Sequence, residues 1–481
     1  MQLAWFLAAL GIGLRLEQYF HNRSLWMDEA LVGLNLIHHS LGQLTHRLDY
    51  HVVAPLAWLF AAKASNVLFG NRELALRLPV ILSGVAAVVV ILFLGKRLLS
   101  TPALCVAVGL FSLSRPLIYY SSELKPYGSD PAVCAVLWLV AFWTLARPTR
   151  VRITLLGLTG AVAVWCSHTA VFVASGLGLT ILGWCIAEAN WRRLVAFAPA
   201  LLFWGVSFGF NYWFFVRASS HDPMLLGAYG PLRLSLWHFA DLEHLVEMVF
   251  AFQQNPITIL LGVSVFAFVA GCVYCGRKSR VALSFLLSPL FFALLASSLH
   301  LYPTWGRFYL FFTPAMVVLI AAGVQALLEA GAAARMPLGT VAVFLLFLQP
   351  LLSAREVMTH PIETTELRPV LAYVQAHQQA TDAWYVYCHS FVNYEYYAET
   401  YGMKGGTVVL GACLDRSHPQ PFPQDAAKLH GRRVWVLVTP PGSPERLDEF
   451  PMLLNAFDSR GVRLDTYWRT GAAAFLYQMK P

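Results

Sequence analysis

Charged residues are scarce in this sequence. Asp, Glu, Lys and Arg together make up only 12% of its 481 residues, whereas 58% are hydrophobic. Soluble globular domains carry about twice that fraction of charge. A chain so poor in polar groups cannot cover its folded surface for water, which excludes an ordinary soluble protein and makes a lipid bilayer the main solvent.

The sequence also lacks internal repeats, low-complexity segments and the pattern of a cleavable signal peptide. No basic region precedes the first apolar run, 3–14, and no small-residue cleavage site follows it, so we expect this run to remain as the first span. The net charge is +8, but the basic residues stand in short clusters between apolar runs. We interpret them as topology signals and predict no nucleic-acid partner.

Long apolar runs predict about eleven transmembrane helices, because most of them approach the roughly 20 residues needed to cross the hydrocarbon core. The runs lie near 3–20, 76–95, 102–119, 129–146, 153–165, 170–187, 194–215, 256–275, 281–299, 308–328 and 337–352. The expected fold is therefore mostly α, a polytopic membrane helical bundle over residues 1–352.

The basic clusters all fall in connections from an even-numbered to an odd-numbered span. They lie at 96–97, 147–152, 192–193, 277–280 and 335. The positive-inside rule assigns such connections to the cytoplasm. The N-terminus is then cytoplasmic, the C-terminus is extracytoplasmic, and all Asp and His residues fall on the outer side, where we expect the chemistry.

The composition changes after residue 352, where charge, Pro and Gly become more frequent. Strand-like runs at 384–391, 434–439 and 472–479 accompany helical patterns at 366–379 and 444–457. Residues 353–481 are therefore predicted to form a small extracytoplasmic α/β domain. This domain contains Cys388 and Cys413, and the sequence leaves open whether they form a disulfide.

The strongest candidate for chemistry is the Trp-Met-Asp-Glu-Ala motif at 26–30, just after the first span. Its two adjacent carboxylates, Asp28 and Glu29, lie at the membrane surface, where Asp28 could serve as a general base. The alternative is an acidic helix N-terminus capped by Asp28. The same loop contains two amphipathic stretches, 28–39 and 53–69, which predict interfacial helices.

Three further groups of polar residues lie at predicted outer ends of spans. His51 could hydrogen-bond a sugar or phosphate, or cap the following helix. Glu123, Lys125 and Tyr127 share the loop after the third span, where a cation and a phenol could hold a phosphate or anchor the chain at the interface. Arg307 opens the tenth span, and it could grip a phosphate or snorkel to headgroups. Together they would suit a lipid-phosphate substrate.

The order of these motifs resembles that of the GT-C glycosyltransferases, which use polyprenyl-phosphate sugars and include protein O-mannosyltransferases, aminoarabinose transferases and galacturonosyl transferases. The resemblance covers most of the membrane part, and the C-terminal domain matches only in size and place. It rests on Trp-x-Asp-Glu-Ala at 26–30, Pro-Leu-x-Trp at 55–58, the segment 68–79, Ser-Glu-x-Lys-x-Tyr at 122–127 and Gly-Arg-Phe at 306–308.

The resemblance implies an inverting transfer of one sugar on the extracytoplasmic face, with a bacterial inner membrane as the expected location. The catalytic residues would be Asp28, as general base, and Glu29. The donor phosphate would be held by His51, Glu123, Lys125, Tyr127 and Arg307. Several relatives have Lys directly before the Pro of the interfacial helix, where this sequence has Ala54, and an Arg is common where Lys125 stands. Both departures leave the composition of the phosphate clamp open.

The partners implied are a polyprenyl-phosphate sugar, membrane lipids, and a lipid, glycan or protein acceptor. A monophosphate donor needs no metal bridge, so no obligatory cofactor is expected. A divalent cation stays open because outer histidines are frequent, at His221, His238, His244 and His300. One alternative is an oligosaccharide or pyrophosphate donor, which would favour a carboxylate metal site. Another is a non-catalytic sugar- or lipid-binding or transport protein, although transporters usually have more ionisable groups at mid-membrane.

Overall fold

A computed structural model describes residues 1–70, 72–220, 222–229, 258–303, 306–398, 406–414, 421–439 and 449–481. These residues divide into two compact units. The first comprises Met1–His21 and His39–Pro361, and the second comprises Asn22–His38 and Ile362–Pro481. The segment with the Trp-Met-Asp-Glu-Ala motif therefore belongs to the same unit as the C-terminal residues.

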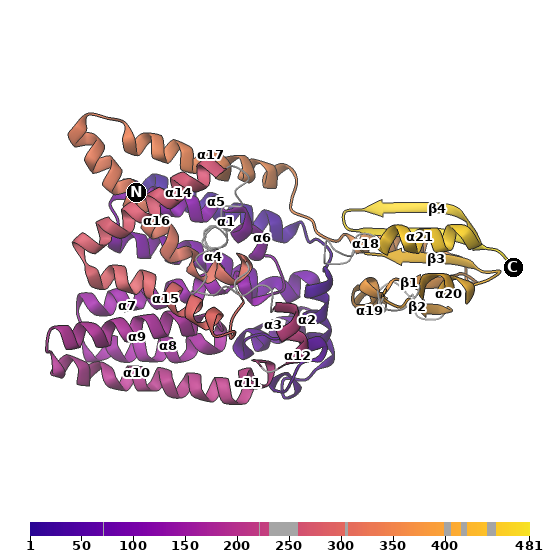
Figure 1. Ribbon diagram of the computed structural model, residues 1–481, viewed down its shortest axis with the longest axis horizontal. Coiled ribbons are helices and arrows are strands. Elements are labelled where there is room, and N and C mark those ends of the chain that lie inside the picture. Colours follow the sequence, from indigo (N-terminus) through magenta and orange to yellow (C-terminus); the bar gives the residue numbers. More distant parts are fainter. Residues whose placement is uncertain are drawn as a thin grey trace. The chain divides into compact units, whose positions relative to one another are not determined.

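The first unit is a bundle of long helices that coincide with the predicted apolar runs (Figure 1). They are α1 (Gln2–Phe20), α4 (Glu73–Leu98), α5 (Thr101–Leu113), α7 (Asp130–Ala146), α8 (Arg150–Cys166), α9 (Ala170–Ala187), α10 (Trp191–Asn211), α14 (Thr258–Lys278), α15 (Arg280–Ser298), α16 (Thr313–Ala334) and α17 (Leu338–Thr359). Among the described residues, eight helical stretches are long and apolar enough to cross a membrane. The chain is an integral membrane protein with the predicted helical architecture.

Three of the eleven predicted spans, α1, α5 and α8, are not among those eight stretches. Helix α5 has only 13 residues and gives way at Ser114 to the short helix α6 (Arg115–Tyr120). Helix α1 carries Arg15 in its outer half. That side chain is buried and donates to the carbonyls of Gly11, Phe111 and Ser112 at 2.9–3.1 Å. Because the last carbonyls of α5 lack partners within their own helix, Arg15 satisfies them.

Close helix packing in the bundle depends on small residues. Helices α14 and α16 meet at Gly271 and Gly323, where an added Cβ would lie only 1.8 Å from a carbonyl oxygen of the facing helix in each case. Small residues allow this approach and so allow van der Waals contact between apolar helices in lipid. Helix α16 is buried along most of its length, with every residue from Thr313 to Val324 buried, and it forms the centre of the bundle.

Short elements lie in the connections of the first unit. The predicted stretch 53–69 contains helix α3 (Leu56–Phe69), preceded by the short helices η1 (Gln43–Thr45) and η2 (Asp49–His51). Helix α10 continues as a π-turn, η4 (Tyr212–Val216), into α11 (Arg217–Ser220), and α12 (Pro223–Tyr229) follows. Two short helices, η3 (Pro126–Gly128) and η8 (Gly306–Phe312), precede α7 and α16. These short helices contain or adjoin most of the candidate site residues.

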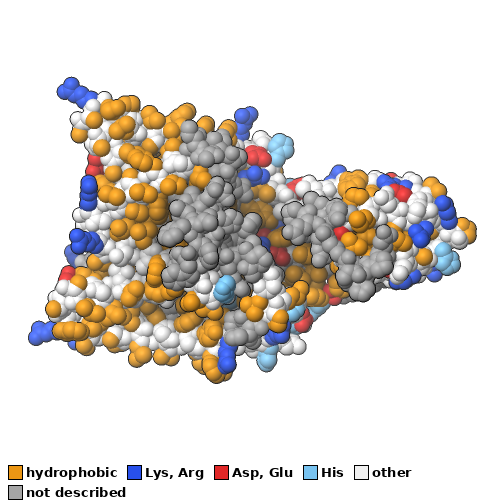
Figure 2. All heavy atoms as spheres, in the orientation of Figure 1, with side chains coloured by type: hydrophobic (Ala, Val, Ile, Leu, Met, Phe, Trp, Pro, Cys, Tyr) orange, Lys and Arg blue, Asp and Glu red, His pale blue; other side chains and the backbone are white. Residues whose placement is uncertain are grey.

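A group of basic residues lies at one end of the first unit. Figure 2 shows Lys and Arg side chains along the left edge of the helical bundle, while hydrophobic side chains cover much of its flank. This distribution is typical of a bundle whose flank meets lipid and whose basic end meets headgroups. The assignment of that end to the cytoplasm stays a prediction.

The second unit contains a five-stranded sheet in the order β2-β1-β3-β5-β4. The strands are β1 (Ala383–Val386), β2 (Val408–Leu410), β3 (Arg433–Val438), β4 (Gly461–Arg469) and β5 (Ala472–Met479). Strand β1 pairs in parallel with β2 and β3, and β5 pairs antiparallel to β3 and β4. The α/β domain predicted from the sequence is thus confirmed in its type.

Helices cover both faces of this sheet. They are α18 (Leu367–His377), α19 (Phe391–Ala398), α20 (Pro421–Ala427) and α21 (Glu449–Arg460), together with α2 (Met27–His38), which packs on α19. Along β3, Val434, Val436 and Val438 join a core with α20 and α21, whereas Trp435 and Leu437 join a core with α18 and α19. Alternate side chains of a strand point to opposite faces, so β3 is apolar on both.

The predicted strand at 384–391 is wrong in its second half. Strand β1 ends at Val386, and the chain turns through η9 (Cys388–Ser390) into α19. Strand β4 was not predicted, although charged and apolar residues partly alternate along it as in an exposed strand. It forms as the partner of β5 in a hairpin whose turn contains Gly471, at a φ of +61°, where a residue without a side chain is favoured.

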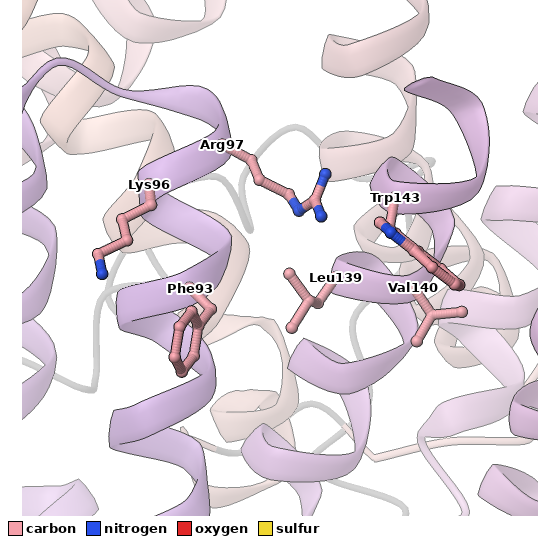
Figure 3. A pocket seen from close by; sticks show the side chains of 6 residues that line it. All are labelled: Phe93, Lys96, Arg97, Leu139, Val140 and Trp143. Atoms are coloured by element: carbon pink, nitrogen blue, oxygen red, sulfur yellow. The ribbon is translucent and has the colours of Figure 1, made fainter. Parts of the chain in front are cut away.

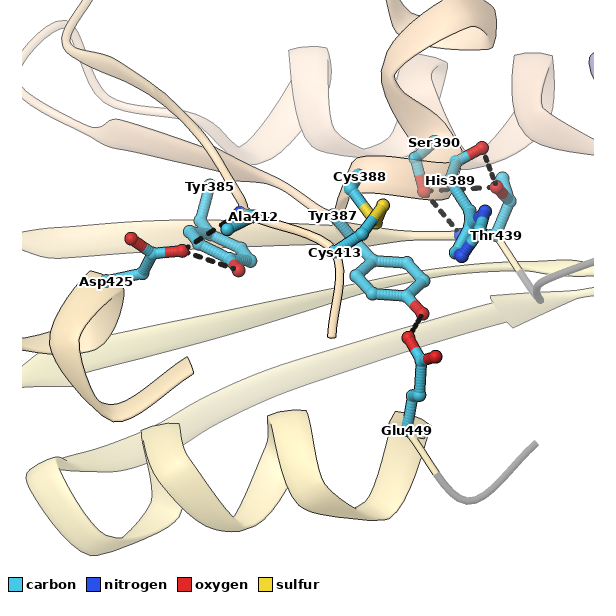
Figure 4. The surroundings of a disulfide bond; sticks show 10 residues. All are labelled: Tyr385, Tyr387, Cys388, His389, Ser390, Ala412, Cys413, Asp425, Thr439 and Glu449. Atoms are coloured by element: carbon cyan, nitrogen blue, oxygen red, sulfur yellow. Dashed lines mark hydrogen bonds between the residues drawn. A yellow bond between two sulfur atoms is a disulfide. The ribbon is translucent and has the colours of Figure 1, made fainter. Parts of the chain in front are cut away.

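A disulfide joins Cys388, after β1, to Cys413, after β2, across 25 residues (Figure 4). Buried polar pairs surround it. The Tyr387 hydroxyl donates to the Glu449 carboxylate at 2.6 Å, and the hydroxyls of Ser390 and Thr439 lie 3.0 Å apart. The sequence did not decide whether Cys388 and Cys413 form a disulfide, and the structure contains one.

Replacing both cysteines, with Cys388→Ser and Cys413→Ser, should lower the free energy of unfolding of the second unit. A crosslink closing a loop of this length stabilises by about 3 kcal/mol, because it restricts the unfolded chain. We would measure the urea midpoint at which the C-terminal region of the full-length protein becomes protease-sensitive. The wild type in reductant should match the variant. Equal midpoints for variant and oxidised wild type would contradict the prediction.

Candidate functional site

Asp28 lies in the first turn of α2 in the second unit. Its side chain is partly exposed, so it can meet solvent or a substrate. The N–H groups of a first helical turn have no partners within the helix and favour a nearby carboxylate. The position suits a carboxylate, but Asp28 is the second residue of α2 and not the N-cap that the alternative interpretation expected.

Glu29 is fully buried and pairs with Arg23, with 2.5 Å between Arg23 Nη1 and Glu29 Oε2. The same carboxylate accepts a hydrogen bond of 3.4 Å from the backbone N–H of Trp26. Trp26 precedes the helix and Glu29 is its third residue, so this bond is one half of a capping box. Glu29 thus fixes the start of α2 and, with it, the backbone that carries Asp28.

The segment before α2 is fixed by residues more than 340 positions away in the sequence. The backbone and hydroxyl of Ser24 donate to Glu366 at 3.1 and 3.2 Å. The N–H of Leu25 donates to the Tyr397 hydroxyl at 2.9 Å, and the Leu25 carbonyl accepts from Asn393 at 2.7 Å. Burial raises the pKa of Glu366. The motif is therefore held by contacts within the second unit.

In the first unit, two loops bring Tyr127 and Arg307 together. The ring of Tyr127 packs edge-on against Phe308, with centroids 5.4 Å apart. The Arg307 guanidinium carbon lies 5.2 Å from the Tyr127 centroid and 5.6 Å from that of Phe308. Lys125 is two residues before Tyr127, and Lys125, Tyr127 and Arg307 all stay partly exposed. Residues that the sequence placed in separate loops thus form one cluster, named here the arginine–tyrosine cluster.

Glu123 belongs to the same loop as Lys125, between α6 and η3. It is buried, and its carboxylate accepts from the Tyr119 hydroxyl at 3.3 Å, while its carbonyl accepts from the N–H of Lys125 at 2.6 Å. The loop is tight, because a Cβ at Gly128 would lie 2.0 Å from the Tyr120 carbonyl oxygen. These contacts give Glu123 a place in shaping the loop that presents Lys125.

His51 lies in a second group of the first unit, with Arg47 and Asp222. Its Nδ1 is 2.6 Å from Asp222 Oδ2, to which Arg47 also donates. Asp222 is buried and accepts from the N–H of Met224 at 3.0 Å, at the start of α12. The hydrogen bond from His51 lowers the pKa of Asp222, with Arg47 adding to the effect. We name these three residues the histidine–aspartate group.

Helix α12 connects the two groups. It begins after Asp222 and ends at Tyr229, whose ring packs edge-on against Phe308 at 5.6 Å. Seven helical residues span roughly 10 Å. The histidine–aspartate group and the arginine–tyrosine cluster therefore lie about one short helix apart. Phe308 contacts both Tyr127 of the cluster and Tyr229 at the end of α12.

Sequence reasoning missed Arg47, Asp222 and Asp130. Asp222 lies 171 positions from His51, and nothing in the local pattern links them. Asp130 begins α7 three residues after Tyr127 and is buried. An Asp-Pro pair opening an apolar run was a signal for it, but the pair is also an ordinary helix start.

Metal ligation finds little support in the described part of the chain. There, Cys388, His389 and Cys413 are the one group of three residues with ligand atoms within 4.8 Å of one another. Cys388 and Cys413 form the disulfide, so their sulfurs cannot act as thiolate ligands while oxidised. His221, His238 and His244 lie outside the described residues, and the question of a divalent cation stays open.

The fold is that of the GT-C membrane glycosyltransferases, as the motifs predicted. The structure resembles ArnT from Cupriavidus metallidurans, solved bound to undecaprenyl phosphate, with a TM-score of 0.55 at 13% identity, over 98% of this chain and 97% of that one. It also resembles the oligosaccharyltransferase of Archaeoglobus fulgidus, solved with a tethered acceptor peptide, with a TM-score of 0.53 at 10% identity, over 98% of this chain and 74% of that one.

Sequence comparison agrees with this fold. The chain is 28% identical over 155 residues to the undecaprenyl phosphate-α-4-amino-4-deoxy-L-arabinose arabinosyl transferase of Edwardsiella ictaluri. That match covers 30% of this chain and 27% of the relative, about a quarter of its length. No protein-family model matches the sequence.

The buried pair of Arg23 and Glu29 predicts a sharp difference between neighbouring carboxylates. Glu29→Gln should lower the free energy of unfolding by about 3–5 kcal/mol, because it leaves the Arg23 charge buried without its counterion. Asp28→Asn is the matched control and should cost less than about 1 kcal/mol, because Asp28 is partly exposed in the first turn. Thermal unfolding of the full-length protein in detergent measures both.

A double replacement, Arg23→Met with Glu29→Leu, should recover most of the stability lost in Glu29→Gln, since it removes both charges. Equal melting temperatures for Glu29→Gln and Asp28→Asn would show that the ion pair does not stabilise the motif.

Proposed function

We propose that this protein is a membrane glycosyltransferase that moves one sugar from a polyprenyl-phosphate donor to an acceptor hydroxyl on the extracytoplasmic face, with inversion at the sugar carbon. The observation that carries the proposal is the arginine–tyrosine cluster, in which one loop brings Arg307 against the ring of Tyr127, two residues after Lys125 in another loop, within a GT-C fold. A phosphate attached to a long apolar chain needs this combination of cations and apolar surface.

Arg307 is suited to hold the phosphate. Its guanidinium packs against the rings of Tyr127 and Phe308, which limits its motion. A planar guanidinium can bind two phosphate oxygens at once, and Lys125 would add a mobile point charge. Both would stabilise the negative charge that the leaving phosphate gains. The undecaprenyl phosphate bound to the structurally similar ArnT supports this ligand class.

His51 would add a third contact to the donor. Asp222 lies against Nδ1 of its ring and keeps that nitrogen as the hydrogen-bond donor. The Nε2 nitrogen, on the other side of the ring, is then the atom offered to a sugar or phosphate oxygen. Arg47 and Asp222 would act through His51 as positioning residues.

Asp28 would be the general base. The acceptor oxygen attacks C1 of the sugar on the side opposite the phosphate, while its proton passes to the Asp28 carboxylate. The bond between C1 and the phosphate oxygen breaks, and the lipid phosphate leaves with the electron pair. Glu29 would position Asp28 through the capping bond to Trp26. No step of this transfer requires a metal or another cofactor.

The acceptor is proposed to be a lipid, glycan or protein of the cell envelope, reached from the outer side of a bacterial inner membrane. The arabinosyl transferase match and the gathering of basic side chains at one end of the bundle support this setting. An oligosaccharide-linked donor is the second candidate, because the fold is equally similar to an oligosaccharyltransferase.

Asp28→Asn should reduce the transfer rate by about a hundredfold or more, because general-base catalysis contributes about 10²–10⁴-fold. We would assay purified protein in detergent with a panel of polyprenyl-phosphate and polyprenyl-pyrophosphate sugars, and a bacterial membrane extract as the acceptor source. Asp49→Asn is a suitable control, since Asp49 is an exposed carboxylate of the same loop that pairs with His39. Equal rates for wild type and Asp28→Asn would remove the catalytic assignment.

Arg307→Lys should weaken binding of polyprenyl phosphate about tenfold or more, although it keeps the charge. Lysine cannot bind two phosphate oxygens in one plane or stack on Tyr127, and a hydrogen bond to a charged group contributes about 1.5–3 kcal/mol. Arg217→Lys is the matched control, because Arg217 also stacks on an aromatic ring, that of Trp213 at 4.3 Å. Binding of a labelled polyprenyl phosphate measures both, and equal affinities would contradict the clamp.

A further inference from the structure

A pocket of about 460 Å³ lies between the C-terminal parts of α4 and α7, away from the candidate site. It is lined by Phe93, Lys96, Arg97, Leu139, Val140 and Trp143 (Figure 3). Trp143 lies 13 residues after Asp130 along α7, which corresponds to roughly 20 Å of helix. The pocket is therefore at the other end of α7 from the arginine–tyrosine cluster.

The pocket combines apolar walls with cations at its rim. Phe93 lines it from α4 and Leu139 and Val140 line it from α7, while Arg97 reaches from α4 toward Trp143 (Figure 3). None of the six lining residues is acidic. The charges at the rim are thus uniformly positive, above a largely hydrophobic interior.

A third cation adjoins the pocket. The Arg152 guanidinium carbon lies 4.2 Å from the Trp143 ring centroid, and Nη1 donates to the Trp143 carbonyl at 2.9 Å. This stacking orders the indole that forms one wall. Three basic residues from two helix ends, Lys96 and Arg97 of α4 and Arg152 of α8, therefore lie around the opening.

The surface beside the pocket has the character of a lipid-facing surface. Phe93 is 44% exposed and Trp5 is 47% exposed, and their rings pack edge-on at 6.3 Å. Lys96 Nζ lies 5.0 Å from the Trp5 centroid and 5.2 Å from that of Phe93. Exposed aromatic rings capped by a lysine mark the level where acyl chains give way to headgroups.

We propose that this pocket binds the headgroup of an anionic phospholipid. The phosphodiester would lie at the Arg97 guanidinium, with Lys96, over the ring of Phe93, as a second nearby cation. The glycerol and upper acyl carbons would lie against Phe93, Val140 and Trp143. Basic pockets between transmembrane helices recognise anionic headgroups in this way. A free phosphate ion would leave the apolar walls unused. The proposal concerns the other end of α7 and does not depend on the glycosyltransferase function.

Native mass spectrometry of the full-length protein in detergent tests the site, with phosphatidylglycerol and phosphatidylcholine of the same acyl chains as probes. The double variant Lys96→Gln with Arg97→Gln should bind phosphatidylglycerol with an affinity lower by about tenfold or more, because each nearby cation contributes to anionic lipid binding. The matched control is Arg277→Gln with Lys278→Gln, the same pair of residue types in the last turn of α14. It should bind phosphatidylglycerol like the wild type.

A second variant, Val140→Trp, fills the pocket and keeps every charge. It should also weaken phosphatidylglycerol binding, and it decides the question alone if the double variant does not fold. Equal affinities for wild type, the double variant and Val140→Trp would overturn the proposal. Equal binding of phosphatidylcholine would overturn it as well, since no anionic headgroup would then be selected. Displacement of the lipid by millimolar inorganic phosphate would also overturn it, since the apolar walls would then contribute nothing.

Discussion

Hydrocarbon offers no hydrogen bonds, and the first unit is organised around that constraint. Each backbone N–H and C=O must find a partner inside the protein, which only helices provide along a single apolar segment. Several polar side chains within the bundle satisfy backbone groups, among them those of Arg15, Trp138 and Trp204. Arg15 is the clearest case, because it is buried in α1 and donates to the carbonyls that the early end of α5 leaves without partners. The early end of α5 leaves carbonyls that need donors, and the buried Arg15 of α1 supplies those donors.

The same constraint places the candidate site residues of the first unit at the ends of the helices. The arginine–tyrosine cluster is built from the loop before α7 and from η8 before α16, and the histidine–aspartate group from η2 and the start of α12. In both groups a charged side chain is fixed by an aromatic ring or a carboxylate. A fixed cation costs less to orient when substrate arrives, which is the advantage of preorganisation in binding and catalysis.

The sequence predicted the helices well because their signal is local. An apolar run of sufficient length determines a membrane helix almost by itself, and strongly apolar strands such as β3 and β5 were recognised for a similar reason. Strand β4 was missed although its composition suits a strand, and it forms by pairing with β5. The end of β1 was misplaced because the apolar residues after Val386 continue into η9 and α19.

The candidate site was predictable as residues but not as contacts. Tyr127 and Arg307 were both identified, yet their packing through Phe308 depends on the arrangement of α7 and α16. The partner of His51 was missed because Asp222 is far away in the sequence.

Glu29 shows the converse limit of sequence reasoning. Two adjacent carboxylates look alike in a motif, but helix geometry sends Glu29 into a buried pair with Arg23 and leaves its neighbour Asp28 partly exposed. Burying an ion pair costs more desolvation free energy than forming one at the surface does. We interpret the buried pair of Arg23 and Glu29 as a contact that fixes a conformation. The conformation it fixes is the first turn of α2, whose backbone carries Asp28. The second unit therefore holds one carboxylate rigid so that the other can stay accessible, and the division of roles follows from burial instead of from residue type.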